Sequence, residues 1–284
     1  MKKIFERLIV FFIGFPALLS IIIFLPQYNY LALNLLAIIF SILGAVEFRN
    51  ILIRKNFVIS VPEAVILGAI SPLAWTVIVS FGIGGSQMVP GAFILGASWL
   101  IFSRIFTSSE NLDSYINRTI TGFAIMIYPG LFMSWIVQMT VFNNAGMVIL
   151  VFFLITLLND AAAWASGYLL GKNNRGLIAA SPNKSVAGFI GGITASVLTG
   201  ILAVLLVPHS FLSDVMPSIP AGAILGFVTG IAAILGDLGE SALKRSAGVK
   251  DSGALILGRG GALDSIDSLL LAAPVFYLLY RVLF

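Results

Sequence analysis

Many of the charged side chains that could do chemistry lie in one stretch near the C-terminus, residues 236–268. Its sequence is GDLGESALKRSAGVKDSGALILGRGGALDSIDS. Five of the chain's twelve carboxylates and four of its sixteen cationic side chains fall within these 33 residues, whereas the flanking sequence is almost entirely apolar. A charged side chain at the centre of a bilayer costs roughly 2.5 to 3.5 kcal/mol on insertion scales, so such residues usually mark functional sites. We therefore interpret this stretch as the active site and the remaining chain as its support.

Polar residues in this stretch recur at helical spacing. Positions 237, 240, 241 and 244 predict one stripe along a helix that leaves the membrane, and positions 264 and 267 open the next apolar run. Two acidic stripes at one depth repel each other unless a cation lies between them. Hard carboxylate oxygens suit Mg²⁺, which keeps several waters and uses one or two carboxylates plus substrate phosphates. The predicted metal ligands are Asp237, Glu240, Asp264 and Asp267.

A simpler interpretation of the same spacing remains open. The acids could belong to two helix ends that form salt bridges with nearby cations, namely Lys244, Arg245 and Lys250.

A glycine-rich turn, Gly258-Arg259-Gly260-Gly261, precedes Asp264. Consecutive glycines let backbone N–H groups approach an anion, and the following helix N-terminus adds a positive dipole end. This turn is a candidate phosphate site, although most such turns only reverse the chain. The sequence contains no G-x-x-x-x-G-K-[ST] motif, which argues against a Walker-type ATPase.

A second polar island covers residues 159–192. Asp160 is the acid of an otherwise apolar run, and Lys184 lies in a short Ser-Pro-Asn-Lys-Ser turn that begins at Ser181. Lys184 is therefore a candidate ligand for substrate, whereas Lys172 and Arg175 fit lipid-headgroup anchors better. The single histidine, His209, lies outside both islands, so histidine-based acid–base chemistry is not expected. Three other acids are interpreted as boundary residues: Glu47, Glu63 and Glu110.

The composition places these islands in a membrane protein. Of 284 residues, 59% are hydrophobic and 10% charged, with a mean hydropathy of +1.06, whereas soluble domains carry about 25% charged residues. The net charge of +4 is modest. The sequence contains no basic run interleaved with aromatic residues, so nucleic-acid binding is not expected. The absence of cysteine excludes disulfides, thiolate metal sites and cysteine nucleophiles.

Apolar runs of about 17 to 25 residues can cross a bilayer as helices. The sequence predicts an all-α protein with nine such spans, at residues 8–26, 30–47, 62–82, 87–106, 119–140, 146–170, 187–208, 219–241 and 265–284. With the N-terminus inside, fifteen of the sixteen lysines and arginines lie in inner segments, and the four outer loops hold none. Both polar islands then face the cytoplasm. We divide the chain into N-terminal spans, 1–145, and a catalytic region, 146–284.

The C-terminal half resembles the phosphatidate cytidylyltransferases, also called CDP-diacylglycerol synthases. Their signature combines S-x-x-K-R, K-D, a glycine-rich turn and D-R-x-D, and the residues in register are Ser241, Lys244, Arg245, Lys250, Asp251, Gly258, Gly260, Gly261, Asp264 and Asp267. Upstream, G-D-L-x-E-S matches residues 236–241. The patterns D-[ST]-x-A-Y…G…G-[KR] and S-P-x-K-[ST]-x-x-G-x-x-G-G resemble Asp160, Ala163, Gly167, Gly171, Lys172, Ser181, Pro182, Lys184, Ser185, Gly188, Gly191 and Gly192.

The chain departs from the family pattern at four places. Arg259 stands at the histidine of the turn, Leu257 at the proline, Ser265 at the arginine of D-R-x-D, and Val186-Ala187 at a tryptophan–glutamate pair. One hypothesis is that the cation missing at position 265 is supplied by Arg259.

The resemblance implies a reaction, its partners and a set of roles. CTP and phosphatidate would give CDP-diacylglycerol and pyrophosphate at the inner face of the cell membrane, with one or two Mg²⁺ ions, in a chain that the family resemblance favours as a homodimer. The implied catalytic residues are Asp160, Lys184, Asp237, Lys244 and Asp264. The implied substrate-binding residues are Ser181, Ser241, Arg245, Lys250, Arg259, Gly260 and Gly261.

Three alternatives stay open. A related CTP-dependent lipid enzyme, resembling a CDP-archaeol synthase or a polyprenol kinase, would use similar residues on another lipid. An ion-coupled transporter would use Asp160, Asp237 and Asp264 as a cation pathway. A family relative without catalytic activity is the third.

Overall fold

The computed structural model describes the backbone of residues 2–105, 112–256, 258 and 260–284, and the side chains in these ranges from residue 12 onward. These residues form helices, in the order α1 (Lys2–Phe24), α2 (Gln27–Ile53), α3 (Val61–Phe81), α4 (Met88–Phe102), α6 (Tyr115–Ile125), a π-helix (Met126–Leu131), α7 (Phe132–Met139), α8 (Ala145–Leu170), α9 (Val186–Leu206), a 3₁₀ turn (Pro208–Ser210), α10 (Ser218–Ser246) and α11 (Leu263–Leu283). Within the described ranges, extended pairing is limited to two isolated bridges. The all-α prediction is confirmed.

Each predicted span falls on a helix, but not every helix is long and apolar enough to cross a membrane. In the described part of the chain, seven are: α2, α3, the continuous segment Tyr115–Met139, α8, α9, α10 and α11. Two shorter apolar helices cover Phe12–Phe24 and Met88–Phe102. The chain is therefore a multi-pass helical membrane protein, and the count of nine spans stays a prediction.

The described chain separates into two compact units. The first comprises residues 1–140 and 246–266, and the second comprises residues 141–245 and 267–284. The turn at 246–266 thus belongs with the N-terminal helices, although it follows them by more than a hundred residues in the sequence.

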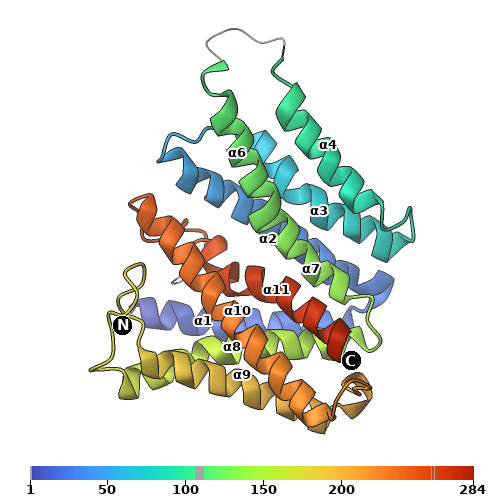
Figure 1. Ribbon diagram of the computed structural model, residues 1–284, viewed down its shortest axis with the longest axis vertical. Helices are drawn as coiled ribbons and strands as arrows, with labels where there is room; N and C mark the ends of the chain where they lie inside the picture. Colours follow the sequence, from blue (N-terminus) through green and yellow to red (C-terminus); the bar gives the residue numbers. More distant parts are fainter. Residues whose placement is uncertain (1, 106–111, 257, 259) are drawn as a thin grey trace. The chain divides into compact units, whose positions relative to one another are not determined.

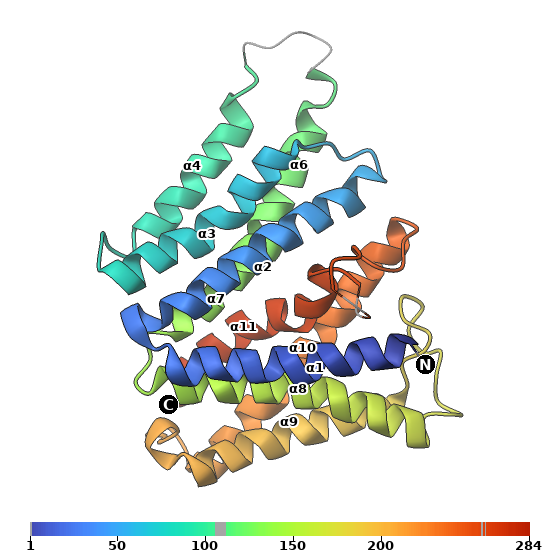
Figure 2. The same ribbon diagram turned by 180° about the vertical axis from the view of Figure 1, so that it is seen from behind.

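In the first unit, α2 and α3 lie side by side (Figure 1 and Figure 2). The Ser41 hydroxyl of α2 lies 2.7 Å from the Gly68 carbonyl of α3 and 2.8 Å from the Pro129 carbonyl of the π-helix. Proline cannot donate the backbone hydrogen bond that continues an α-helix, and such positions commonly bend or widen helices. Through its two hydrogen bonds, Ser41 connects α2 to both α3 and the π-helix.

The second unit is built on close contact between α8 and α9 (Figure 2). A side chain at Gly188 would meet the Ala163 carbonyl at 2.8 Å, and one at Gly191 would meet the Ser166 hydroxyl at 2.0 Å. Glycines at these positions therefore let the two backbones approach, as small residues do in membrane helix pairs. Buried Asn159 of α8 donates to the Ser196 hydroxyl of α9 at 2.8 Å and to the Gly230 carbonyl of α10 at 3.3 Å.

Candidate active site

A cavity of about 480 Å³ opens in the second unit, between α8, α9 and α10. Its lining residues are Asn159, Asp160, Ala163, Trp164, Gly167, Tyr168, Arg175, Asn183, Lys184, Ser185, Gly188, Phe189, Ile234 and Asp237. Small-molecule sites have volumes of about 300 to 1,000 Å³ and place a few polar groups in a largely apolar lining. Three of the predicted catalytic residues, Asp160, Lys184 and Asp237, line this one cavity.

The connection between α8 and α9 presents Lys184. The Ser181 N–H donates to the Ile178 carbonyl at 3.0 Å, and the Lys184 N–H donates to the Ser181 carbonyl at 3.1 Å, which makes a tight turn. Ser185 then caps α9 by accepting the Gly188 N–H at 3.0 Å. The Lys184 ammonium consequently reaches α10 and forms an ion pair with Asp237.

Carboxylates on α8, α10 and the part of α11 that belongs to the second unit interact with one another. The Ser268 hydroxyl of α11 lies 3.4 Å and 3.5 Å from the two oxygens of Asp160 on α8. The same hydroxyl lies 3.3 Å from Asp267, whose carboxylate interacts electrostatically with Asp237, Glu240 and Asp160. Neighbouring carboxylates of like charge favour a cation or a proton bound between them.

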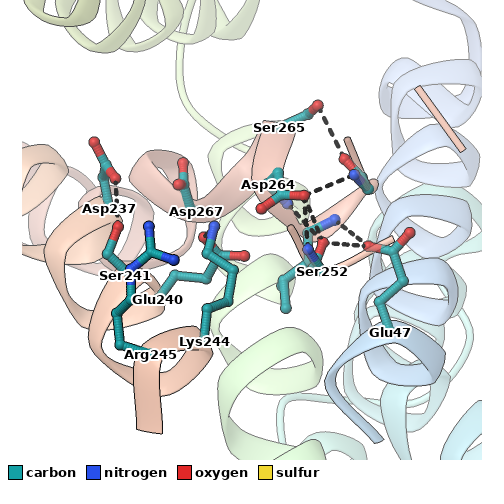
Figure 3. Close-up of polar contacts among 12 residues, drawn as sticks. Glu47, Asp237, Glu240, Ser241, Lys244, Arg245, Ser252, Asp264, Ser265 and Asp267 are labelled. Atoms are coloured by element: carbon teal, nitrogen blue, oxygen red, sulfur yellow. Dashed lines mark hydrogen bonds and ion pairs between the residues drawn. The ribbon is translucent and has the colours of Figure 1, made fainter. Parts of the chain in front are cut away.

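The stripe predicted along α10 forms, because the helix continues to Ser246. Glu240 is fully buried and forms an ion pair with Lys244, which is 8% exposed. The Ser241 hydroxyl lies 3.5 Å from Asp237, at the limit of a hydrogen bond (Figure 3). The simpler interpretation predicted salt bridges between these acids and nearby cations. Among the described side chains, the pair of Lys244 and Glu240 is such a salt bridge. Arg245 is exposed and donates from Nε to the Ala180 carbonyl at 3.4 Å.

The glycine-rich turn lies in the first unit, where the N–H groups of Gly260 and Gly261 already have acceptors. The Gly260 N–H donates to the Ile256 carbonyl at 3.0 Å, and the Gly261 N–H donates to Oδ2 of Asp264 at 2.7 Å. Gly260 adopts a φ of +112°, a conformation that L side chains rarely take. Lys250 is exposed. Substrate binding by these residues stays a prediction.

Asp264 also accepts hydrogen bonds from its own unit. Its Oδ2 receives the Ser252 N–H at 2.9 Å and lies 2.9 Å from the Ser252 hydroxyl (Figure 3). Asp264 therefore organises the turn at the start of α11 whatever else it binds. Arg259 and Leu257, two of the departures from the family pattern, lie outside the described residues.

The donor set fits a magnesium ion brought in with phosphates. Among the described residues, no group of three or more histidine, cysteine or carboxylate side chains is arranged to hold a metal by itself. Mg²⁺ commonly uses one or two carboxylates and takes its other ligands from water and substrate phosphates. Asp237 and Asp267, which interact electrostatically, can supply such carboxylates. In the structure the Lys184 ammonium is the cation paired with Asp237.

Two residues at these sites, Asn159 and Glu47, were not predicted from the sequence. Asn159 belonged to the second island but received no role, although its adjacency to Asp160 in an apolar run could have suggested one. Glu47 was interpreted as a boundary residue, yet it is 8% exposed and accepts hydrogen bonds from residues more than two hundred positions away. No local spacing could have revealed that contact.

These features define a class: a multi-pass helical membrane protein with a cavity lined by carboxylates and a lysine. A sequence model of the cytidylyltransferase family matches residues 5–283. The chain therefore belongs to the cytidylyltransferase family.

Individual relatives agree with this assignment. The chain is 30% identical over 268 residues to a phosphatidate cytidylyltransferase of Staphylococcus epidermidis, covering 93% of this chain and 96% of that protein. It is 41% identical over 129 residues to a phosphatidate cytidylyltransferase of Synechocystis, covering 44% and 42% of the two chains. An uncharacterised Escherichia coli protein, YnbB, is 35% identical over 163 residues, 56% and 52% of the two chains. The chain thus spans about half the length of the latter two relatives.

Proposed function

We propose that this chain is a phosphatidate cytidylyltransferase, which converts CTP and phosphatidate into CDP-diacylglycerol and pyrophosphate. One observation carries the proposal: Asp160, Lys184 and Asp237 line a single cavity in a chain that matches the cytidylyltransferase family almost from end to end. The near full-length similarity to the Staphylococcus epidermidis protein supports the choice of substrates.

In this reaction an oxygen of the phosphatidate phosphate attacks the α-phosphorus of CTP. The bond from that phosphorus to the oxygen bridging the β-phosphate breaks, and pyrophosphate leaves. The second pKa of a phosphate monoester is about 6, so phosphatidate is largely a dianion at cytosolic pH and needs no strong base. The site must then provide position and charge compensation, as in other phosphoryl transfers.

The lysine turn and the carboxylates divide these tasks. Lys184 would bind a phosphate of CTP, and its partner Asp237 would hold a Mg²⁺ ion, which would supply neutralisation of the phosphate charge. Asp160 and Asp267 would complete the acidic wall, and Asp264, three residues before Asp267 in the sequence, would be a further metal ligand. Four cations, Lys244, Arg245, Lys250 and Arg259, would bind the triphosphate of CTP or the phosphate of the lipid.

The cavity mouth carries two aromatic side chains suited to a membrane boundary. Trp164 and Tyr168 are stacked at 5.8 Å between ring centroids and are 71% and 70% exposed. Aromatic rings of this kind concentrate at the headgroup level of bilayers. In this proposal phosphatidate approaches the cavity along these two rings, with its acyl chains still in the lipid. Nine spans with a cytoplasmic N-terminus in the cell membrane would place this mouth at the inner face, and a homodimer is the oligomer that the family resemblance favours.

The direct test uses the purified chain in mixed micelles with phosphatidate, Mg²⁺ and CTP labelled with ³²P at the α-phosphate. Label that enters the organic phase only when phosphatidate and Mg²⁺ are both present establishes cytidylyl transfer. Release of CDP in place of pyrophosphate would instead indicate a lipid kinase. An unlabelled lipid phase, beside an active family enzyme as control, would refute the proposed substrate pair.

A further inference from the structure

The carboxylate of Glu47, on α2, is held by backbone groups at the start of α11. Its Oε1 accepts the Ala262 N–H at 3.0 Å, and its Oε2 accepts the Leu263 N–H at 2.8 Å. All of these residues belong to the first unit. The first N–H groups of a helix have no partner within the helix, so Glu47 caps α11 from a helix more than two hundred residues earlier in the sequence.

Ser252 joins this cap to Asp264. Its hydroxyl lies 2.8 Å from Oε2 of Glu47 and 2.9 Å from Oδ2 of Asp264 (Figure 3). A serine hydroxyl carries one hydrogen, so it donates to one carboxylate at a time. Ser252 also accepts the Asp264 N–H at 3.3 Å. The two acids are therefore linked through one buried side chain.

The turn is shaped to bring these carboxylates against its backbone. A side chain at Gly261 would lie 2.1 Å from the Ser252 hydroxyl and 2.2 Å from Oε2 of Glu47. Two neighbouring negative charges are tolerated here because four N–H groups and the positive end of the α11 dipole compensate them. The glycines expected to admit a substrate phosphate thus admit the protein's own carboxylates.

We infer that Glu47 is a positioning residue, which fixes the start of α11 and, through Ser252, the orientation of the Asp264 carboxylate. Because Glu47 of α2 caps α11, the turn and the first residues of α11 are held in a single conformation. Asp264 therefore presents the same geometry to the substrates in each turnover. Because Asp264 acts in the proposed cytidylyl transfer, this role of Glu47 rests on that function.

The first test reads the turn itself and needs no activity. In Glu47→Gln, the N–H groups of Ala262 and Leu263 lose a charged acceptor, so amide hydrogen exchange of peptides covering 260–263 should become at least about tenfold faster. Glu63→Gln is a matched control, because Glu63 is a capping carboxylate of the same unit that pairs with Arg118 instead. Exchange at 260–263 should be unchanged in that control.

The second test measures coupling to Asp264 by cytidylyl transfer in micelles. Residues that orient a metal ligand usually change activity by about 10- to 100-fold when replaced. We therefore expect Glu47→Gln to lower kcat by at least about tenfold while the KM for phosphatidate stays nearly constant. The double variant with Asp264→Asn should be no slower than Asp264→Asn alone, since both changes remove one function. Ser252→Ala, which deletes only a hydroxyl, should show a smaller kcat loss with the same non-additivity.

Each result separates this role from the proposed function. An inactive wild type refutes the proposed function, whereas the exchange test still decides whether Glu47 holds the turn. Unchanged exchange at 260–263 in Glu47→Gln overturns the inference. The inference is also overturned if the kcat losses of Glu47→Gln and Asp264→Asn multiply in the double variant. It is overturned as well if Glu63→Gln lowers kcat as much as Glu47→Gln does.

Discussion

The ion pair between Lys184 and Asp237 is half-open to solvent, with side chains 26% and 28% exposed. Exposed or partly exposed pairs contribute about 0 to 1 kcal/mol to stability. Asp237 and Lys184 therefore gain little by binding each other, and both can exchange partners when a nucleotide and its cation arrive. This differs from Glu240 and Lys244, which are buried together.

Replacing Lys184 should impair catalysis and leave the fold intact. We expect Lys184→Ala to lower kcat/KM for CTP by about 100-fold, because a preorganised charge that stabilises a phosphoryl-transfer transition state is lost. Lys172→Ala is the matched control, since Lys172 is an exposed cation in the same connection between α8 and α9. Steady-state kinetics with varied CTP measure both. If the two variants lowered kcat/KM equally, Lys184 would contribute only to the overall positive charge and would not bind CTP in the site.

Replacing Asp237 should change the response to magnesium. In Asp237→Asn, which keeps the shape but removes the charge, we expect the Mg²⁺ concentration for half-maximal activity to rise at least tenfold. A metal site that uses only one or two carboxylates depends strongly on each. Asp214→Asn, an exposed acid of the same unit, serves as control. An unchanged Mg²⁺ dependence in Asp237→Asn would remove Asp237 from the metal site.

At the scale of elements, α9 and α10 touch through glycines. A side chain at Gly200 would lie 2.0 Å from the Gly222 carbonyl, and one at Gly222 would lie 2.5 Å from the Gly200 carbonyl. Such contacts let the helix that follows Lys184 pack directly on the helix that carries Asp237. The distance between the two site residues therefore depends on positions far from them along each helix.

Gly200→Ala should consequently destabilise the second unit. Overpacked contacts typically cost about 1 to 3 kcal/mol, and here the obstacle is a backbone carbonyl, which cannot rotate away as a side chain can. Gly239→Ala on α10 is the control, because a side chain there meets nothing within 4 Å. Thermal unfolding in detergent should show a lower midpoint for Gly200→Ala and no decrease for Gly239→Ala. Identical midpoints would mean that the two helices can separate without loss.

At the scale of the whole molecule, the number of membrane crossings depends on the helix α4. The helix α4 has 15 residues, fewer than the roughly 17 to 25 that a spanning helix needs. The distribution of lysine and arginine nevertheless predicts that it crosses, because the segments before and after it differ in positive charge.

The absence of cysteine makes this testable with single introduced thiols. We expect a membrane-impermeant thiol reagent to label Ser86→Cys and Asp214→Cys in intact cells. Asp113→Cys and Asn173→Cys should react only after permeabilisation. All four positions are exposed. Labelling of positions 86 and 113 from the same side would show that α4 does not cross, and labelling of 173 from outside would reverse the orientation of the site.

Some of this protein could be predicted from sequence because the relevant physics is local. Spans follow from runs of apolar residues, since a bilayer demands internally hydrogen-bonded apolar helices wherever the chain crosses it. The stripe from Asp237 to Lys244 follows from helical spacing, and the structure continues α10 through it. The grouping of Asp160, Lys184 and Asp237 was suggested by resemblance to a family, and these residues line one cavity.

Tertiary structure alone decided the partners of the charged groups. The sequence offered the glycines at 258–261 as a cradle for phosphate, but in the folded chain the N–H groups of Gly261 and Ala262 bind the carboxylates of Asp264 and Glu47. Glu47 lies on α2, and only the fold of the first unit brings it to this turn. Hydrogen bonds act over about 3 Å and are indifferent to separation along the chain. For that reason sequence determined which helices form and which carry charge, whereas long-range packing determined which charges meet.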